Sequence, residues 1–246
     1  MTTENDRFRV EKAGAVANVT LCTPDEGNTL GPPDMGELGQ AIEDAGKDPA
    51  IKIVVVRGEG EDFCLGRRIQ PSQKRPDIAR DFRERVADAI LGVYEHLRRT
   101  PVPVMTVVQG RAKGFGCAFV AQSDITIADE GARFSLPEMD NNLPPTLAIS
   151  ACLPKMPAKP ILDLVLSREE IDANAAFTHG LVTRVAKAGA LSTTVNDYIA
   201  KLADRDRDAL VAIKEYMQLA PTMDLAGQAR YGANLIAVEM TSQGSS

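Results

Sequence analysis

The chain has 246 residues, of which 44% are hydrophobic and 25% charged, and this is the usage of an ordinary globular protein with a sizeable core. Its net charge of −6 argues against a nucleic-acid partner, because nucleic-acid binders usually present a basic face. No run of 18 apolar residues and no secretory leader pattern occurs, so we predict a cytoplasmic protein with no membrane partner.

In chain order, the apolar pattern predicts two short strands over residues 8–10 and 15–21, then a helix over 33–47. Residues 51–57 form a nearly continuous β-branched run, which is typical of a strand buried on both faces. Residues 80–99 repeat apolar side chains at helical spacing and predict a long amphipathic helix that ends before Pro101.

The middle of the chain alternates between strand and helix patterns. A buried strand is predicted over 104–109, a glycine-rich turn over 110–116 and a short apolar helix over 117–122. Two more strands follow, over 125–128 and 132–134. This alternation predicts an α/β fold built from βαβ-type units around a layered core.

The last third of the chain is mostly helical by periodicity, with its clearer helices over 168–176 and 191–203. We therefore predict a core over residues 1–150 and a helical region over 151–246, which together form a single functional domain.

Cysteine and histidine usage restricts the chemistry. The four cysteines form no C-x-x-C pair and lie among apolar residues, which predicts small buried hydrophobes rather than a zinc site. The only histidines are His96 and His179, so a Ser-His-Asp triad or a histidine metal site is hard to build. We expect no metal.

Three segments together indicate a catalytic site: DFCLGRRI at 62–69, GRAKGFGCA at 110–118 and FSLPE at 134–138. Gly66 lacks a Cβ and can bring backbone close to a ligand, while Gly114 and Gly116 lie at the entry to a helix, whose first N–H groups are unpaired. Two such N–H groups can converge on one carbonyl oxygen, and Glu138 beyond them could move a proton on the adjacent carbon.

These segments, in this order and spacing, resemble those of the crotonase (enoyl-CoA hydratase/isomerase) superfamily. Four further stretches agree with the resemblance: LCTP at 21–24, NTL at 28–30, SDI at 123–125 and GLV at 180–182. The resemblance covers about residues 8 to 240. It implies a spiral of ββα units, a helical C-terminal trimerisation region, a homotrimer or dimer of trimers, and an acyl-CoA substrate. It implies no tightly bound cofactor, with coenzyme A entering as part of the substrate.

Carried over position by position, the family's two oxyanion-hole N–H groups fall on Arg67 and Phe115. Its two hydratase glutamates fall on Ala118 and Glu138, so only the second carboxylate is kept. The other positions that the resemblance assigns to substrate or CoA binding are Cys64, Gly66, Arg68, Ile69, Gly114 and Asp140. The family usually has one more helix after the stretch near residues 238–241, and we expect this chain to lack it, which leaves the acyl-chain specificity open.

A single carboxylate favours one reaction of the family over another. Hydration is best served by two carboxylates, whereas moving a double bond from C3 to C2 needs one base, and Glu138 can supply it. Hydration by Glu138 with a water, helped by Asp140, stays open, as does a catalytically degenerate member that only binds acyl-CoA. The side chain of Arg67 could bind a substrate carboxylate or a CoA phosphate, or remain solvated, and Arg68, Lys113, Lys74 and Arg75 could add to a basic patch.

Overall fold

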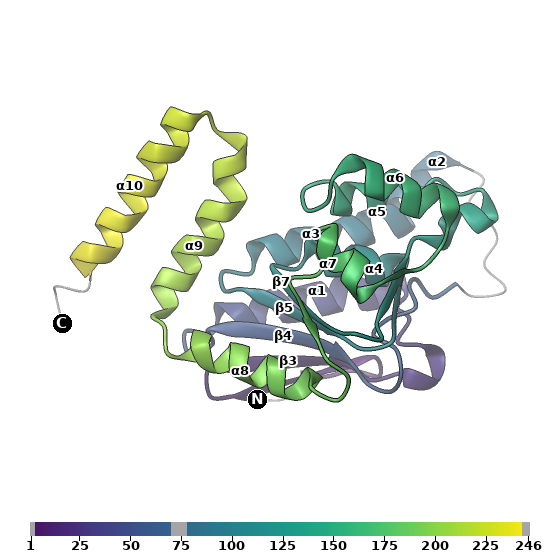
Figure 1. Cartoon of the computed structure of the whole chain (residues 1–246), viewed down its shortest axis with the longest axis horizontal. Coiled ribbons are helices and arrows are strands. Elements are labelled where there is room, and N and C mark those ends of the chain that lie inside the picture. Colours follow the sequence, from purple (N-terminus) through teal and green to yellow (C-terminus); the bar gives the residue numbers. More distant parts are fainter. Residues whose placement is uncertain (1–2, 70–77, 243–246) are drawn as a thin grey trace.

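The main sheet of the protein is mostly parallel and lies at the centre of the computed structural model, which describes residues 3–69 and 78–242 (Figure 1). Its seven strands run in the order β1-β2-β3-β4-β5-β7-β10. The two pairings among β1, β2 and β3 are antiparallel, and every pairing from β3 onward is parallel. The strands are β1 (Thr3–Glu4), β2 (Phe8–Ala13), β3 (Val16–Leu21), β4 (Ile53–Gly58), β5 (Val104–Val108), β7 (Ile125–Asp129) and β10 (Arg184–Ala186).

Both faces of this sheet are covered, as the β-branched run of β4 predicted. Val54 and Val56 pack into the larger core cluster together with α1, α3 and α4, whereas Ile53 and Val55 pack into a second cluster that includes Val195 of α8. A strand with apolar side chains on both faces is therefore stable only between two helical layers. The α/β class and the layered core are confirmed.

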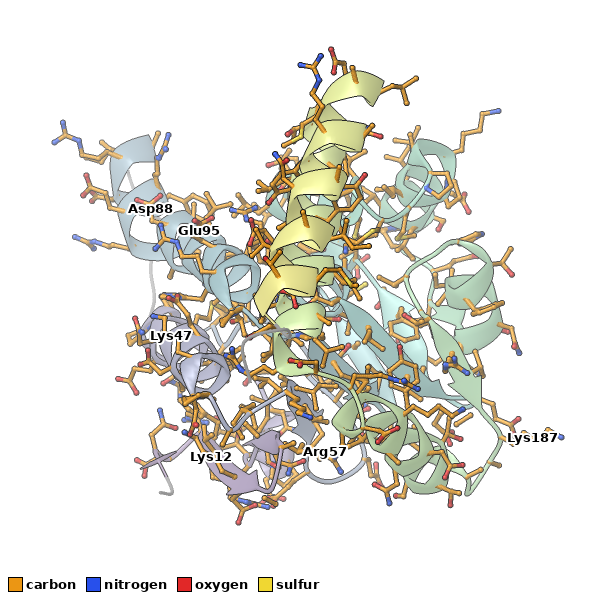
Figure 2. The ribbon with its side chains drawn as sticks, turned by 90° about the vertical axis from the view of Figure 1, so that its left-hand side faces the viewer. Lys12, Lys47, Arg57, Asp88, Glu95 and Lys187 are labelled. Carbon is orange, nitrogen blue, oxygen red and sulfur yellow. The ribbon has the colours of Figure 1, made fainter. Side chains whose placement is uncertain are left out.

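Helices separate most of the main-sheet strands along the chain, and the last three helices follow β10 in succession. The helices are α1 (Pro32–Lys47), α2 (Ala79–Phe82), α3 (Asp88–Arg99), α4 (Phe115–Gln122), α5 (Thr146–Cys152), α6 (Ala158–Ser167), α7 (Ala173–Thr178), α8 (Leu191–Ala203), α9 (Arg207–Leu219) and α10 (Leu225–Ser242). Figure 2 shows Lys47 on α1 and Asp88 and Glu95 on α3 pointing outward, as the polar faces of amphipathic helices should.

A smaller sheet joins the loops that follow the strands of the main sheet. β6 (Arg111–Lys113) pairs parallel with β8 (Arg133–Ser135), which pairs antiparallel with β9 (Ile171–Asp172). Two isolated bridges extend this pattern, between Leu30 and Arg67 and between Cys64 and Ala112. Successive turns of the chain thus contribute one segment to each sheet, which is the predicted spiral of ββα units.

Three predicted helices have different bounds. The prediction of a helix over 168–176 was wrong: α6 ends at Ser167, Arg168 is left-handed with φ of 62°, and α7 starts only at Ala173, where the Asp172 side chain accepts a hydrogen bond from Ala175 N–H. The predicted helix over 80–99 is interrupted by a π-helical turn at Arg83–Ala87. α4 begins two residues before its predicted start, at Phe115.

The sheets extend beyond residue 150, because β9 joins the smaller sheet and β10 the edge of the main sheet. After β10, α8 packs on the main sheet, and Figure 1 shows α9 and α10 as a hairpin at the side of the molecule. The last described helix, α10, runs through residues 238–241.

Candidate active site

The first turn of the site follows β4, and its backbone hydrogen bonds fix the direction of the Arg67 N–H. Leu30 N–H donates to Gly66 O over 3.3 Å, and Arg68 N–H donates to Leu30 O over 2.8 Å. Leu30 therefore forms its hydrogen bonds with Gly66 and Arg68, the residues on either side of Arg67, so the N–H of Arg67 points away from Leu30. Among the residues that the structure describes, it donates to no backbone carbonyl.

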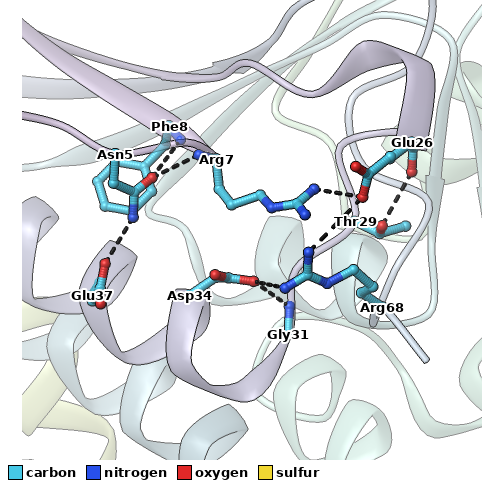
Figure 3. A network of polar contacts seen from close by, with 9 residues as sticks. All are labelled: Asn5, Arg7, Phe8, Glu26, Thr29, Gly31, Asp34, Glu37 and Arg68. Atoms are coloured by element: carbon cyan, nitrogen blue, oxygen red, sulfur yellow. Dashed lines mark hydrogen bonds and ion pairs between the residues drawn. The ribbon is translucent and has the colours of Figure 1, made fainter. Parts of the chain in front are cut away.

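Side-chain contacts hold this turn against the start of α1 (Figure 3). The Arg68 guanidinium lies 2.9 Å from Asp34 Oδ2 and 3.9 Å from Glu26 Oε2. Asp34 also accepts a 2.8 Å hydrogen bond from Gly31 N–H, and Glu26 pairs with Arg7. The predicted ligand-binding side chain of Arg68 is thus engaged with two carboxylates of its own chain.

The second turn, between β6 and α4, packs directly on the first. A Cβ at Gly66 would lie 3.1 Å from Lys113 O and 3.8 Å from the Phe115 N atom. A Cβ at Gly116 would lie only 2.3 Å from Cys64 O, so this close backbone contact requires glycine. Phe115 is the first residue of α4, and its N–H belongs to the unpaired group at a helix start. The two predicted oxyanion-hole positions therefore belong to neighbouring backbone segments.

Glu138 lies on a short 3₁₀ helix, Pro137–Asn141, that follows β8. Gly114 N–H donates to Ser135 O over 2.9 Å and so ties this segment to the glycine turn. A Cβ at Gly114 would lie 2.9 Å from Glu138 Oε1, which places the carboxyl group directly beside the start of α4. The structure thus brings together four residues from the three predicted segments: Gly66, Gly114, Phe115 and Glu138.

The carboxyl group of Glu138 is shielded and has a free oxygen. Its Oε2 atom is buried and has no hydrogen-bond partner among the described residues. Burial raises the pKa of Glu138, and a hydrogen bond from its own backbone N–H opposes that rise. A carboxyl group with a raised pKa gains and loses a proton more readily near neutral pH, as a proton-transfer group must.

The surroundings of Glu138 are almost entirely apolar. Ala118, at the position where the family has its first glutamate, is fully buried. Burial raises the pKa of the Cys152 thiol to about 12 and that of Cys117 well above its usual range, with the Glu138 charge adding to both, so both thiols are neutral. Polar groups nearby include the unpaired Ser135 Oγ atom on β8 and the hydroxyl of Tyr94 on α3, whose pKa burial also raises. Tyr94 escaped the sequence analysis because it falls on the apolar stripe of its helix.

Several other predicted residues lie apart from this cluster. The Ile69 side chain is exposed. Asp140 forms an exposed ion pair with Arg168 at 3.2 Å, and Lys113 pairs with Glu170 at 2.6 Å. The Arg67 guanidinium is half-buried, which lowers its pKa, and it forms no ion pair with a described residue. Lys74 and Arg75 lie outside the described residues.

Two cavities accompany these elements. A small apolar void beside Cys64, Phe115 and Phe119 is too narrow to admit water. A larger cavity of about 380 Å³ lies between α9 and α10, away from Glu138. Within residues 3–69 and 78–242 no cluster of three metal-ligating side chains occurs, and no helix is long and apolar enough to cross a membrane.

The sequence model of the enoyl-CoA hydratase/isomerase family matches residues 11–244. The chain belongs to the enoyl-CoA hydratase/isomerase family. It is accordingly an enzyme of a family whose members process CoA thioesters, as predicted. A probable enoyl-CoA hydratase of Rhizobium meliloti is 30% identical over 227 residues, which cover 92% of this chain and 86% of the relative. A short-chain-enoyl-CoA hydratase of Clostridium acetobutylicum is 30% identical over 210 residues, covering 83% and 77%.

Solved structures of the family superimpose closely on the chain. The crystal structure of human enoyl coenzyme A hydratase domain-containing protein 3 has a TM-score of 0.89 at 23% identity, covering 96% of this chain and 92% of that protein. A putative enoyl-CoA hydratase from Thermobifida fusca, solved in complex with CoA, has a TM-score of 0.83 at 25% identity, covering 98% and 95%. The crotonase fold is confirmed.

Proposed function

We propose that the enzyme shifts the double bond of an enoyl-CoA, with Glu138 as its single acid/base. The observation that carries this proposal is the one buried, unpartnered carboxyl oxygen of Glu138 beside Gly114, together with alanine at position 118. Glu138 removes a proton from C2 of a 3-enoyl-CoA and returns it to C4. One base is sufficient, because the same carboxyl group removes the proton from C2 and then delivers it to C4.

The backbone of the two glycine turns supports the charge that this reaction creates. Removal of the C2 proton moves an electron pair onto the thioester oxygen, and the N–H groups of Arg67 and Phe115 donate to that oxygen. In sites of this kind, loss of one such donor typically costs about 10²–10³ in kcat. The positive end of the α4 dipole favours the same charge.

Hydration is the second candidate, and the relatives favour it. The proteins from Rhizobium meliloti and Clostridium acetobutylicum are both named hydratases. In this alternative, Glu138 takes the proton of a water that attacks C3 and then delivers it to C2. The CoA bound to the protein from Thermobifida fusca supports an acyl-CoA ligand for either reaction.

An NMR time course with a 3-enoyl-CoA in deuterated water separates the candidates. We expect a 2-enoyl-CoA to form and to carry deuterium exchanged at Glu138, and Glu138→Ala to lower the rate by about 10²–10⁴. Glu169→Ala, an exposed charge removal, should leave the rate unchanged. A parallel time course starts from a 2-enoyl-CoA. Formation of a 3-hydroxyacyl-CoA in that reaction, with no conversion of the 3-enoyl-CoA in the first, would favour hydration alone. Stabilisation by acyl-CoA without turnover of either substrate would favour the degenerate alternative.

We also propose that the enzyme assembles as a homotrimer or dimer of trimers through its C-terminal helices. The exposed apolar residues of α9 and α10 support this, since large exposed apolar surfaces usually mark contacts between proteins. Its proposed location is the cytoplasm, although the relatives from Xenopus laevis and human are named mitochondrial. Cell fractionation with an activity assay tests the location.

A further inference from the structure

Arg111, at the start of β6, joins the strand before the second turn to Asp62 on the first turn by a fork of hydrogen bonds. Asp62 Oδ1 accepts from the backbone N–H and from the Nε–H of Arg111, each over 2.9 Å, and Nη2 donates to Oδ2 over 2.6 Å. The Asp62 side chain is only 13% exposed. The guanidinium holds the pKa of this carboxyl group below its usual range. One arginine thus fixes both oxygens of a carboxylate on the neighbouring segment.

Backbone hydrogen bonds carry this link toward the two proposed donors. Cys64 N–H donates to Arg111 O over 3.2 Å, and Lys113 N–H donates to Cys64 O over 2.9 Å. The two segments therefore run side by side, with a parallel bridge at Cys64. Arg67 follows three residues after Cys64, and Phe115 two residues after Lys113. A shift of one segment along the other consequently changes the distance between the two donors.

A second guanidinium fixes the other end of the first turn (Figure 3). Arg68 comes directly after Arg67 and lies 2.9 Å from Asp34 Oδ2. Asp34 belongs to the first turn of α1, and its carboxylate also accepts a hydrogen bond from the N–H of Gly31, the residue before this helix. A Cβ at Gly31 would lie 3.2 Å from Arg68 Nη2, so the guanidinium packs tightly against the helix start. The first turn is thereby tied to α1 as well as to β6.

The N–H of Arg67 lies between these two ends and has no contact of its own to fix it. It donates to no backbone carbonyl of a described residue, so the backbone on either side sets its direction. A donor stabilises a developing oxyanion best when it is already aimed at the oxygen, because no free energy is then spent on turning it. Both ion pairs are partly exposed. Such pairs add little to stability, so the main effect of these two pairs is to fix the position of the turn.

We propose that Arg68 and Arg111 are positioning residues, which hold the N–H of Arg67 at the thioester oxygen through Asp34 and Asp62. The inference rests on the proposed role of the Arg67 N–H in the oxyanion hole. In this role neither guanidinium touches the substrate. Each is already engaged with a carboxylate of its own chain, so it attracts a CoA phosphate less than a free arginine would.

Arg111→Gln and Arg68→Gln remove the charged forks and keep polar side chains. With a 3-enoyl-CoA, we expect each variant to lower kcat by about ten- to a hundredfold, because a displacement of about 1 Å at the reacting atoms can cost about a hundredfold. KM should stay within about threefold, since binding of the CoA part does not depend on the Arg67 N–H. Arg111→Lys keeps the charge without the fork and should recover part of kcat. Arg99→Gln, which breaks an exposed 2.9 Å pair with Glu95 on α3, is the matched control and should change neither constant.

A truncated substrate distinguishes positioning from direct binding of CoA. The pantetheine thioester of the same 3-enoyl acid keeps the thioester carbonyl but has no diphosphate and no ribose phosphate. If Arg68 and Arg111 position the Arg67 N–H, their Gln variants lose the same factor in kcat/KM with this thioester as with the CoA thioester. A defect that disappears with the pantetheine thioester would show that the arginines bind phosphate and would overturn the proposal.

Infrared difference spectroscopy of a bound saturated acyl-CoA, isotope-labelled at its thioester carbonyl, reports on the donors themselves. Two N–H donors polarise the C=O bond, so the wild-type enzyme should shift its stretching band to lower frequency than in the free thioester. In the two Gln variants this shift should shrink, with circular dichroism unchanged. Arg111→Lys, the milder change, gives the same comparison if a Gln variant does not fold.

The outcomes separate the two proposals. A full infrared shift together with wild-type kcat in the folded variants would overturn the positioning role of Arg68 and Arg111 and leave the oxyanion hole standing. The absence of any shift in the wild-type enzyme would instead overturn the role of the Arg67 N–H, on which the positioning proposal rests.

Discussion

At the scale of the residue, the decisive feature is a carboxyl group held in apolar surroundings against a glycine. Gly114 has φ of 52° and ψ of −116°, a backbone conformation that residues other than glycine rarely adopt. Glu138 Oε1 occupies the space that a Cβ at this position would need. The same position therefore sets both the backbone of the turn and the place of the carboxyl group.

Gly114→Ala should damage catalysis and stability together. We expect the free energy of unfolding to fall by about 1–3 kcal/mol from backbone strain, and kcat to fall because the new methyl group displaces Glu138. Urea denaturation and steady-state kinetics check the two effects. Gly92→Ala is the control, since a Cβ there meets nothing within 4 Å and Gly92 lies within a helix, where alanine is preferred. Unchanged kcat in a folded Gly114→Ala variant would contradict this placement of Glu138.

The raised pKa of Glu138 links stability to pH. Burial raises the folded-state pKa above the unfolded value, so the protein loses stability as pH rises through the folded pKa, where the buried group must ionise. Glu138→Gln removes that ionisation. We expect the variant to gain Tm over the wild type as pH rises from below the ordinary carboxyl range toward 8, with little difference at the acidic end. A Tm difference that does not depend on pH would contradict the prediction.

Residue patterns in the sequence predict most of the residues that the structure brings together in the candidate site. Gly66, Gly114 and Glu138 were accessible because glycine in a turn and a single retained carboxylate are visible in the sequence. Tyr94 could not be predicted as a neighbour of Glu138, because a tyrosine on the apolar face of a helix has the pattern of a core residue. The ion pair that engages Arg68 joins residues 34 positions apart, and no local pattern predicts such a contact.

At the scale of the element, Lys214 anchors α9 to the body of the protein. Its buried ammonium group lies 2.8 Å from Asp124 Oδ2 and donates to Leu97 O and Val102 O, at 3.0 and 3.1 Å. Burial lowers the pKa of Lys214, and the Asp124 charge opposes that decrease. One side chain thus connects α9 with the end of α3 and the start of β7.

Lys214→Met should destabilise the enzyme by about 3 kcal/mol or more, because it leaves a carboxylate and two carbonyl groups without their partner. Chemical denaturation measures the loss, and Lys201→Met on the exposed face of α8 should cost little. Equal stability of the two variants would show that α9 is held mainly by apolar contacts.

The bounds of the helices show which segments the local sequence pattern predicts correctly and which it does not. The predicted helix over 168–176 has a plausible apolar pattern, but pairing of β9 with β8 and the cap at Asp172 outweigh it. Long-range pairing decides the state of short segments, whereas the long periodic helices α1, α3 and α8 could be predicted from sequence alone.

At the scale of the whole molecule, the C-terminal hairpin presents apolar side chains to solvent. Ile213 and Met217 of α9 and Ile236 of α10 are each more than 60% exposed and line the larger cavity. In the proposed trimer, these side chains are covered by a neighbouring subunit.

Ile236→Arg should therefore shift the enzyme to a smaller oligomer, since a charge buried in an apolar contact is costly. Light scattering after size-exclusion chromatography measures the mass. Lys187→Glu, a charge reversal in the exposed loop after β10, is the control and should leave it unchanged. If wild type and Ile236→Arg have the same mass, the hairpin is not the contact between subunits.

The backbone contact between the two glycine turns has a consequence for how activity is acquired. The turns are nearly fifty positions apart in the sequence, and the backbone segments that carry Arg67 and Phe115, the proposed pair of donors, meet only when Gly66 packs on Lys113 O and Gly116 on Cys64 O. A partly folded chain with its helices formed but its spiral open has no such pair of donors. During refolding, recovery of turnover should consequently lag behind recovery of helical circular dichroism, so that catalysis reports closure of the spiral rather than formation of its parts.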